Sequence, residues 1–418
     1  MKLPNEKVVM TFAQVLIKTL SMVFLLKLAA KSFSVEEFAY YSQFLNVNQV
    51  LILLSGAWCT TGVVSLIVSN EFNDKEILST SVITSSLTSV IFLIVIVTLF
   101  VFFPTVLTIT DIGYKTLIFL SLSSILNNLI LISQSRLNAY DKILELSTTL
   151  IILSVVNLLI GVIFYFSYPN GMYLYLPVSQ FVAFLIINKK YSIVRFINIR
   201  FFRLDVLISL CKFILMGAVT IGCVYLSQIF LREYFISRFD SEWVGFWQVS
   251  FRLSELYLML FSAVFSIFII PIYAKENSKE FLYYKSLTIF KLLVPIAFLG
   301  LALQFALKKY IILIAFDSSY LNASSFYNVQ IFSDFLKILA WAFCYVFLAK
   351  GDVKKYISIE VFSCVVLIVS SILYSYFGIE YSLNFAYLTQ SFVYLVLSYF
   401  LLFRGRYERD SFNNNEVS

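Results

Sequence analysis

Long apolar runs separated by short polar connections repeat along the whole chain. Twelve of them approach or exceed the ~20 residues that a helix needs to cross about 30 Å of hydrocarbon. The runs cover residues 8–30, 41–68, 80–104, 114–134, 146–168, 171–188, 207–230, 243–272, 285–306, 326–348, 355–377 and 382–403. Lys18 and Lys27 interrupt the first run, so we do not expect a cleaved signal peptide. The pattern predicts an all-α polytopic membrane protein with twelve transmembrane helices.

The composition agrees with lipid, rather than water, as the main solvent. Hydrophobic residues make up 60% of the chain and charged residues only 13%, whereas soluble domains carry about 25% charged residues. This balance excludes a cytosolic enzyme, a secreted disulfide scaffold and a nucleic-acid-binding protein. The chain has no histidine, and its five cysteines lie in apolar runs without a CxxC pair. We therefore expect no metal site, no cofactor and no catalytic residues.

The basic residues indicate the orientation in the membrane. With a cytoplasmic N-terminus, the inner segments hold 19 of the 31 Lys and Arg residues and the outer segments hold six. The positive-inside rule then places both termini in the cytoplasm. The most basic connection divides the chain into an N-terminal lobe (1–188, helices 1–6), a cytoplasmic linker (189–206), a C-terminal lobe (207–403, helices 7–12) and a cytoplasmic tail (404–418).

The two halves carry a similar short motif. Residues 37–41 read EFAYY after the first span, and residues 243–247 read WVGFW after the seventh. Both are bulky, bulky, small, aromatic, aromatic, and both follow an acidic cluster on the outer side. The motif predicts an internal repeat, which is a common plan among transporters.

Nine charged residues fall inside the predicted spans, beyond their first two positions. The basic ones are Lys18, Lys27, Lys212, Arg252, Lys291 and Lys337, and the acidic ones are Glu255, Asp334 and Glu360. A charge facing lipid at mid-bilayer costs about 2.5–3.5 kcal/mol. Most of the nine must therefore face a wet cavity or one another.

Four of these charges form two same-helix pairs by spacing. Arg252 and Glu255 are three residues apart, as are Asp334 and Lys337, so each pair shares a helix face and can form an ion pair. A structural bridge and a titrating or gating pair both fit this spacing.

The other four lysines have no acidic residue within four positions on their own helix. Lys27 and Lys212 lie near span ends, where snorkelling to the interface explains them as well as a cavity does. Lys18 and Lys291 lie deeper. Isolated cations at that depth predict a site that receives an anion.

Several motifs resemble one transporter family. Residues 244–248 (VGFWQ) are followed by Ser254-Glu255-x-Tyr257-Leu258 and by Phe265-Ser266 before Pro271. Further matches are Lys212-Phe213, Lys291 with Pro295, Asp334-x-Leu336-Lys337, Ala349-Lys350, Tyr356 before Glu360-Val361 and, more loosely, Leu16-x-Lys18, Lys27-Leu28 and Ser32-Phe33. In order and spacing they resemble the Wzx-type O-antigen and lipid III flippases of the multidrug/oligosaccharidyl-lipid/polysaccharide exporter superfamily. The chain departs from that pattern at Arg252, where the family has a small polar residue.

The resemblance implies two six-helix lobes around a central cationic cavity in the bacterial inner membrane. It implies movement of an undecaprenyl-diphosphate-linked oligosaccharide, an O-antigen unit or a related one, from the cytoplasmic to the periplasmic leaflet by alternating access. The six intramembrane cations would bind the substrate, and Glu255, Asp334 and Glu360 would couple transport to H⁺ or Na⁺ or gate it. Expected partners are the lipid-linked glycan and the bilayer, with the polymerase and chain-length regulator of the same pathway as further candidates.

Two other functions remain open. A small-molecule cation antiporter of the same superfamily predicts an acidic cavity, whereas six of the nine intramembrane charges are basic. A membrane polysaccharide polymerase or glycosyltransferase would be expected to carry a large periplasmic loop or catalytic acids at the outer surface. The predicted outer connections are short.

Overall fold

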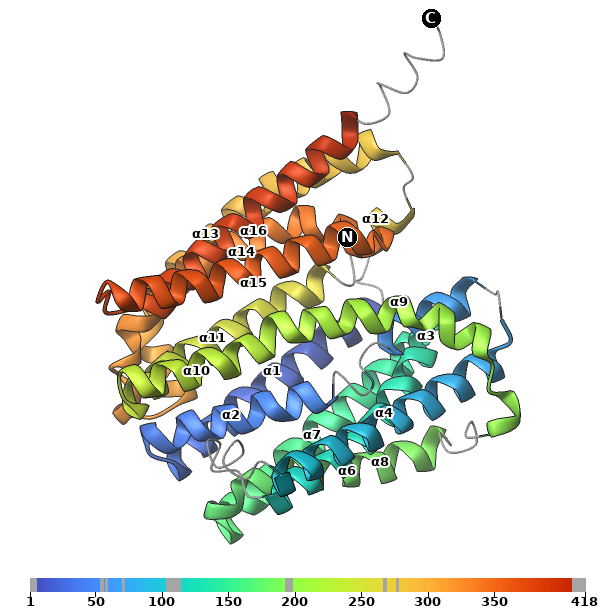
Figure 1. Cartoon of the computed structure of the whole chain (residues 1–418), viewed down its shortest axis with the longest axis horizontal. Coiled ribbons are helices and arrows are strands. Elements are labelled where there is room, and N and C mark those ends of the chain that lie inside the picture. The colour runs from blue at the N-terminus through green and yellow to red at the C-terminus, as the bar shows by residue number, and fades with distance from the viewer. Residues whose placement is uncertain are drawn as a thin grey trace, which may run out of the picture. The chain divides into compact units, whose positions relative to one another are not determined.

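The computed structural model describes residues 6–52, 56, 59–69, 72–102, 114–191, 198–265, 269–275 and 278–407. Every regular element within these ranges is a helix (Figure 1). Residues 192–197 of the predicted linker and 408–418 of the predicted tail lie outside them.

Contacts between Cα atoms divide the chain into two compact units, Met1–Ser237 and Arg238–Ser418. The first unit contains α1 (Glu6–Ser32), α2 (Val35–Ile52), α3 (Cys59–Ser69), α4 (Asp74–Phe102), α6 (Tyr114–Ala139), α7 (Ile143–Ser167), η2 (Pro169–Leu174), α8 (Tyr175–Tyr191), η4 (Ile199–Phe201), α9 (Leu204–Ile221), the π-helical turn η5 (Gly222–Leu226) and α10 (Ser227–Arg238, whose last residue begins the second unit). The second contains α11 (Ser241–Val264), α12 (Ile270–Lys275), α13 (Lys279–Ala315), η7 (Ser318–Tyr320), α14 (Ala323–Lys350), α15 (Val353–Tyr376) and α16 (Ser382–Tyr407).

The described residues contain ten helical segments long and apolar enough to cross a membrane, and they match ten of the twelve predicted spans. The two remaining predictions fall on α2 with α3 (41–68) and on α11 with α12 (243–272). Parts of both ranges lie outside the described residues. The all-α, multi-pass membrane class predicted from the hydrophobic runs is confirmed.

The seventh predicted span packs within the first unit. Val206 and Leu210 of α9 belong to the same buried apolar cluster as Val63 of α3 and Ile77 of α4. Apolar burial thus packs α9 with helices of the first unit, which extends to Ser237. The division into two lobes of six helices stays a prediction.

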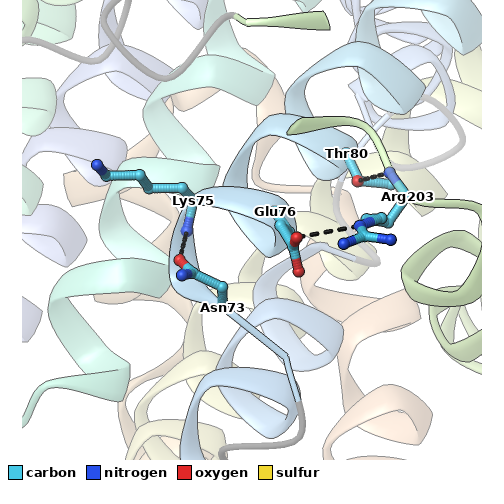
Figure 2. A network of polar contacts seen from close by, with 5 residues as sticks. All are labelled: Asn73, Lys75, Glu76, Thr80 and Arg203. Carbon is cyan, nitrogen blue, oxygen red and sulfur yellow. Dashed lines mark hydrogen bonds and ion pairs between the residues drawn. The ribbon is translucent and has the colours of Figure 1, made fainter. Parts of the chain in front are cut away.

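The end of the basic linker is fixed to the start of α4, as Figure 2 shows. The Arg203 backbone N–H donates to Thr80 Oγ1 at 3.0 Å, and its guanidinium Nε lies 3.0 Å from Glu76 Oε1. Ser79 Oγ also donates to the carbonyl of Asn198 at 2.5 Å. The linker thus contributes tertiary contacts as well as positive charge.

The repeated motif occupies equivalent positions in two helices. It forms the third to seventh residues of α2 and of α11. In each helix, the side chain three residues before the motif caps the N-terminus. The Glu37 N–H donates to Ser34 Oγ, and the Trp243 N–H donates to Asp240 Oδ1. Equivalent caps before equivalent motifs agree with the predicted internal repeat.

A fully buried arginine joins α10 to α2. The sequence places Arg232 in an outer connection, but α10 continues through it and its side chain is completely buried. Nη1 donates to the carbonyl of Ala39 at 2.6 Å, Nη2 lies 2.6 Å from Glu233 Oε1, and the guanidinium lies over the ring of Tyr40. These contacts compensate the lost hydration of the charge.

The predicted orientation can be tested with single cysteines in a variant whose native cysteines are replaced by serine. Lys354, at the start of α15, and Lys309, near the end of α13, are both exposed. We expect K309C to react with a membrane-impermeant thiol reagent in cells with a permeabilised outer membrane. K354C should react only after the inner membrane is opened. The reverse pattern would refute the cytoplasmic placement of the termini.

Candidate substrate and coupling sites

Lys18 lies on a different face of α1 from the helix's most exposed apolar side chains. Val9, Phe12, Leu16, Leu20 and Phe24 form a stripe of side chains that are 43–67% exposed. At 3.6 residues per turn, Lys18 projects about 180° away from the centre of that stripe.

Lys18 shares its own stripe with buried side chains. Thr11, Ser21 and Leu25, at three- and four-residue steps along the same face, are each less than 8% exposed, whereas Lys18 is exposed. Met22, one turn further along this face, is 38% exposed, but the most exposed apolar side chains of α1 lie on the opposite face. This placement favours contact with water or a polar ligand.

The other three lysines without an acidic residue nearby on their own helix have different surroundings from Lys18. Half-buried Lys27 projects with the exposed apolar stripe of α1, and Lys212 lies beside the exposed stripe of Ile208 and Leu215 on α9. Both placements agree with snorkelling near a span end. Lys291 lies on the broad exposed face of α13, among Leu292 and Phe298, so its surroundings alone do not separate a lipid face from a cavity.

Arg252 and Glu255 form the ion pair that their spacing allows. Arg252 Nη1 donates to Glu255 Oε2 at 2.6 Å, with the two side chains 8% and 29% exposed. The arginine is thus nearly buried, whereas part of the carboxylate is exposed.

Asp334 and Lys337 do not form the ion pair that their spacing allows. The Asp334 side chain is buried, and its Oδ1 accepts from Ser254 Oγ at 2.5 Å and from Gln330 Nε2 at 3.3 Å. Ser254 is on α11, so tertiary packing supplies the carboxylate's strongest contact. Lys337 is half-buried, and its charge acts on both Asp334 and Glu360.

The hydrogen bonds of Asp334 extend into a buried polar network between α11, α14 and α16. Gln330 Nε2 also donates to Ser254 Oγ at 3.2 Å, and Asn384 Nδ2 lies 3.3 Å from both Gln330 Oε1 and Ser250 Oγ. All members are less than 3% exposed. We call Ser250, Ser254, Gln330, Asp334 and Asn384 the buried network.

Several polar atoms in and beside the buried network lack a hydrogen-bond partner among the described residues. Among the described residues, Asp334 Oδ2 and Asn384 Oδ1 are buried without a hydrogen-bond partner, and so are both side-chain polar atoms of Gln248 on α11. Leaving such a group unsatisfied costs about 1–3 kcal/mol. Carboxylate, amide and hydroxyl oxygens together are suited to a proton, a water molecule or a hard cation.

Glu360 belongs to a second buried group on α14, α15 and α16. Its Oε1 accepts from Tyr394 OH at 2.8 Å, and Cys344 Sγ lies 2.9 Å from the same hydroxyl. Tyr356 also hydrogen-bonds the carboxylate. Glu360 is therefore held by hydroxyl donors across helices, with the charge of Lys337 nearby.

Sequence reasoning missed most of the neutral members of these groups. Ser250, Gln330, Asn384 and Tyr394 carry no charge and lie far apart in the chain. A signal was present in the repeated three- and four-residue steps through 330, 334 and 337 on α14. That periodicity identifies a polar helix face, but not the helices that pack on it.

Comparisons place this architecture among known transporters, although no family model matches the chain. It is similar in structure to an inward-facing multidrug resistance MATE family transporter of the MOP superfamily, with TM-score 0.75, 14% identity and coverage of 95% of this chain and 98% of that one. The lipid II flippase MurJ, inward closed, gives TM-score 0.71, 15% identity and coverage of 95% and 87%. The fold is that of these transporters.

A relative identified by its sequence agrees with the family resemblance of the motifs. The lipid III flippase of Escherichia coli (strain K12) is 24% identical over 161 residues, which are 38% of this chain and 39% of the relative. The matched region thus spans about two fifths of the curated relative. This relative and the MurJ-like fold support the predicted resemblance to flippases of lipid-linked oligosaccharides.

The Arg252–Glu255 pair predicts unequal effects on stability. Glu255→Gln leaves a buried guanidinium without its carboxylate and should destabilise the protein by about 3 kcal/mol. Arg252→Met leaves a carboxylate that is already partly exposed and should cost clearly less. Thermal unfolding of the purified protein in detergent measures both, with the exposed Glu242→Gln on the same helix as the control. Equal losses for the two variants would contradict this asymmetry.

Proposed function

We propose that the protein is a flippase that moves an undecaprenyl-diphosphate-linked oligosaccharide from the cytoplasmic to the periplasmic leaflet of the bacterial inner membrane. The similarity to a lipid III flippase and the MurJ-like fold support this proposal. The polymerase and chain-length regulator of the same pathway would act with it. We further propose that both termini are cytoplasmic, in agreement with the distribution of basic residues.

The placement of Lys18 carries the proposal. An exposed lysine projects away from the most lipid-like face of α1, at a depth where a cation needs a counter-charge. A diphosphate is an anion that must cross the same hydrocarbon, and an ammonium group can donate three hydrogen bonds to it. In this proposal Lys18 contacts the diphosphate, and Lys291, Lys337, Arg252, Lys27 and Lys212 are the other candidate cations for the substrate path.

We also propose that an ion gradient drives the step through the buried network. Asp334 has one carboxylate oxygen without a partner among the described residues, next to amide and hydroxyl oxygens. Binding of H⁺ or Na⁺ there would neutralise the only formal charge of the network. Because the network joins α11, α14 and α16, occupancy would change how these three helices pack. Glu360 and Glu255 are the other candidates for coupling or gating.

The likeness to a MATE transporter favours a second candidate, a small-molecule cation antiporter. Such a protein needs acidic side chains where its cargo binds. The exposed intramembrane candidates are lysines, whereas Asp334 and Glu360 are buried among hydrogen-bond donors. Export of a cationic dye by the purified, reconstituted protein, without translocation of lipid-linked glycan, would favour the antiporter.

Lys18→Gln tests the substrate site. In a deletion strain we expect loss of surface glycan and accumulation of the lipid-linked precursor in the inner leaflet, because the amide supplies no positive charge. Lys18→Arg should retain part of the activity, since the charge survives with altered geometry. The control Lys31→Gln removes an exposed lysine from the end of the same helix. Wild-type glycan in the Lys18→Gln strain, at normal protein abundance, would refute the role of Lys18.

Asp334→Asn tests the coupling site. The amide retains the size of the carboxylate and can still accept from Ser254, so we expect a folded protein with near wild-type thermal stability. Reconstituted transport should lose its response to an imposed H⁺ or Na⁺ gradient, because the ionisable group is gone. Asp317→Asn, outside the network in the same unit, is the control. Unchanged gradient dependence in Asp334→Asn would rule out coupling through this carboxylate.

A further inference from the structure

A small cavity lies where four helices of the second unit end or begin. It has a volume of about 220 Å³ and is bounded by the start of α13, the end of α14, the start of α15 and residues near the end of α16. This volume is below the ~300–1,000 Å³ of sites that enclose a drug-sized ligand. The cavity therefore suits one part of a larger molecule.

The turn between α14 and α15 builds one wall of the cavity. Gly351 ends α14 with φ of +62°, a conformation that favours glycine, and the Asp352 N–H donates back to the carbonyl of Phe347 at 2.9 Å. Asp352 then caps α15 by accepting from the Lys355 N–H at 3.2 Å. This tight connection brings Lys350 and Lys355 to the same opening.

The rim of the cavity is cationic. Lys279, Lys350 and Lys355 come from three helices, and Asp352 is the only acid among the lining residues. Lys355 Nζ lies 3.4 Å from Asp352 Oδ2 and 5.7 Å from the centre of the Phe347 ring, so both groups hold it in place. The lining carries a net formal charge of +2, which suits a phosphate.

The floor of the cavity is apolar. Leu282, Val346, Phe347 and Leu402 line it and are 3–8% exposed. Free phosphate would leave this surface without a partner. A molecule with a phosphate joined to a hydrocarbon chain would cover both parts.

We propose that this cavity binds the phosphate of an anionic phospholipid, with the beginning of an acyl chain against the apolar floor. Lys279, Lys350 and Lys355 all belong to segments that the positive-inside rule places at the cytoplasmic surface. Basic pockets between transmembrane helices on that side suit anionic headgroups. The bound lipid would connect α13, α14 and α15. The lining residues include neither Lys18 nor a member of the buried network.

Native mass spectrometry of the full-length protein in detergent tests the proposal. Titration with phosphatidylglycerol should give one tight binding event, and zwitterionic phosphatidylcholine should bind at least tenfold more weakly at that site. The variant Lys279→Gln/Lys350→Gln should weaken phosphatidylglycerol binding at least tenfold. The matched control Lys285→Gln/Lys354→Gln removes the same charge from α13 and α15 but leaves the lining residues unchanged, and it should stay within twofold of the wild type.

Three results would overturn the proposal. The first is wild-type phosphatidylglycerol binding by Lys279→Gln/Lys350→Gln. The second is equal loss in the control, which would indicate general surface charge. The third comes from competition. Displacement of phosphatidylglycerol by inorganic phosphate at millimolar concentration would assign the site to free phosphate. Displacement by undecaprenyl phosphate at a much lower concentration than phosphatidylglycerol would assign it to the carrier lipid. Flipping activity enters none of these readouts, so they are independent of the proposed transport function.

Discussion

The cost of placing charge in hydrocarbon is the constraint on which the rest of this protein depends. A bilayer offers no water to an ionised side chain, so each intramembrane charge needs a partner, a hydrated surface or a route to the interface. The described residues use the first and the third of these solutions. Arg252 has Glu255, Asp334 and Glu360 have hydroxyl and amide donors, and Lys27 lies near the end of its helix.

Two buried polar groups in the second unit meet this constraint in different ways. The Glu360 carboxylate accepts hydrogen bonds from the hydroxyls of Tyr394 and Tyr356. Asp334 has donors on one oxygen only, and atoms of Asn384 and Gln248 near the same helices also lack partners among the described residues. Asp334 therefore keeps a buried acceptor oxygen for a proton or a cation, and for this reason we propose coupling at Asp334 rather than at Glu360.

The fold by itself does not decide what such a protein carries. Chains with the same architecture bear the names of a multidrug transporter and of a lipid II flippase, each at about 15% identity or less. At that distance, cargo depends on a few side chains placed on a shared scaffold. An exposed lysine opposite the lipid-like face of α1 favours an anion, and an acidic residue there would favour a cation.

The helical membrane class followed from the sequence alone because bilayer thickness sets the length of an apolar run. The Arg252–Glu255 contact was also predictable, since both residues lie on one turn of one helix. Tertiary structure decided the rest. Asp334 bonds to Ser254, 80 residues away, rather than to Lys337 three residues along. The seventh span packs with the first unit, and Arg232, which the predicted spans place in an outer connection, is buried. Local spacing determines which residues share a helix face, but only packing between helices determines which other side chains that face meets.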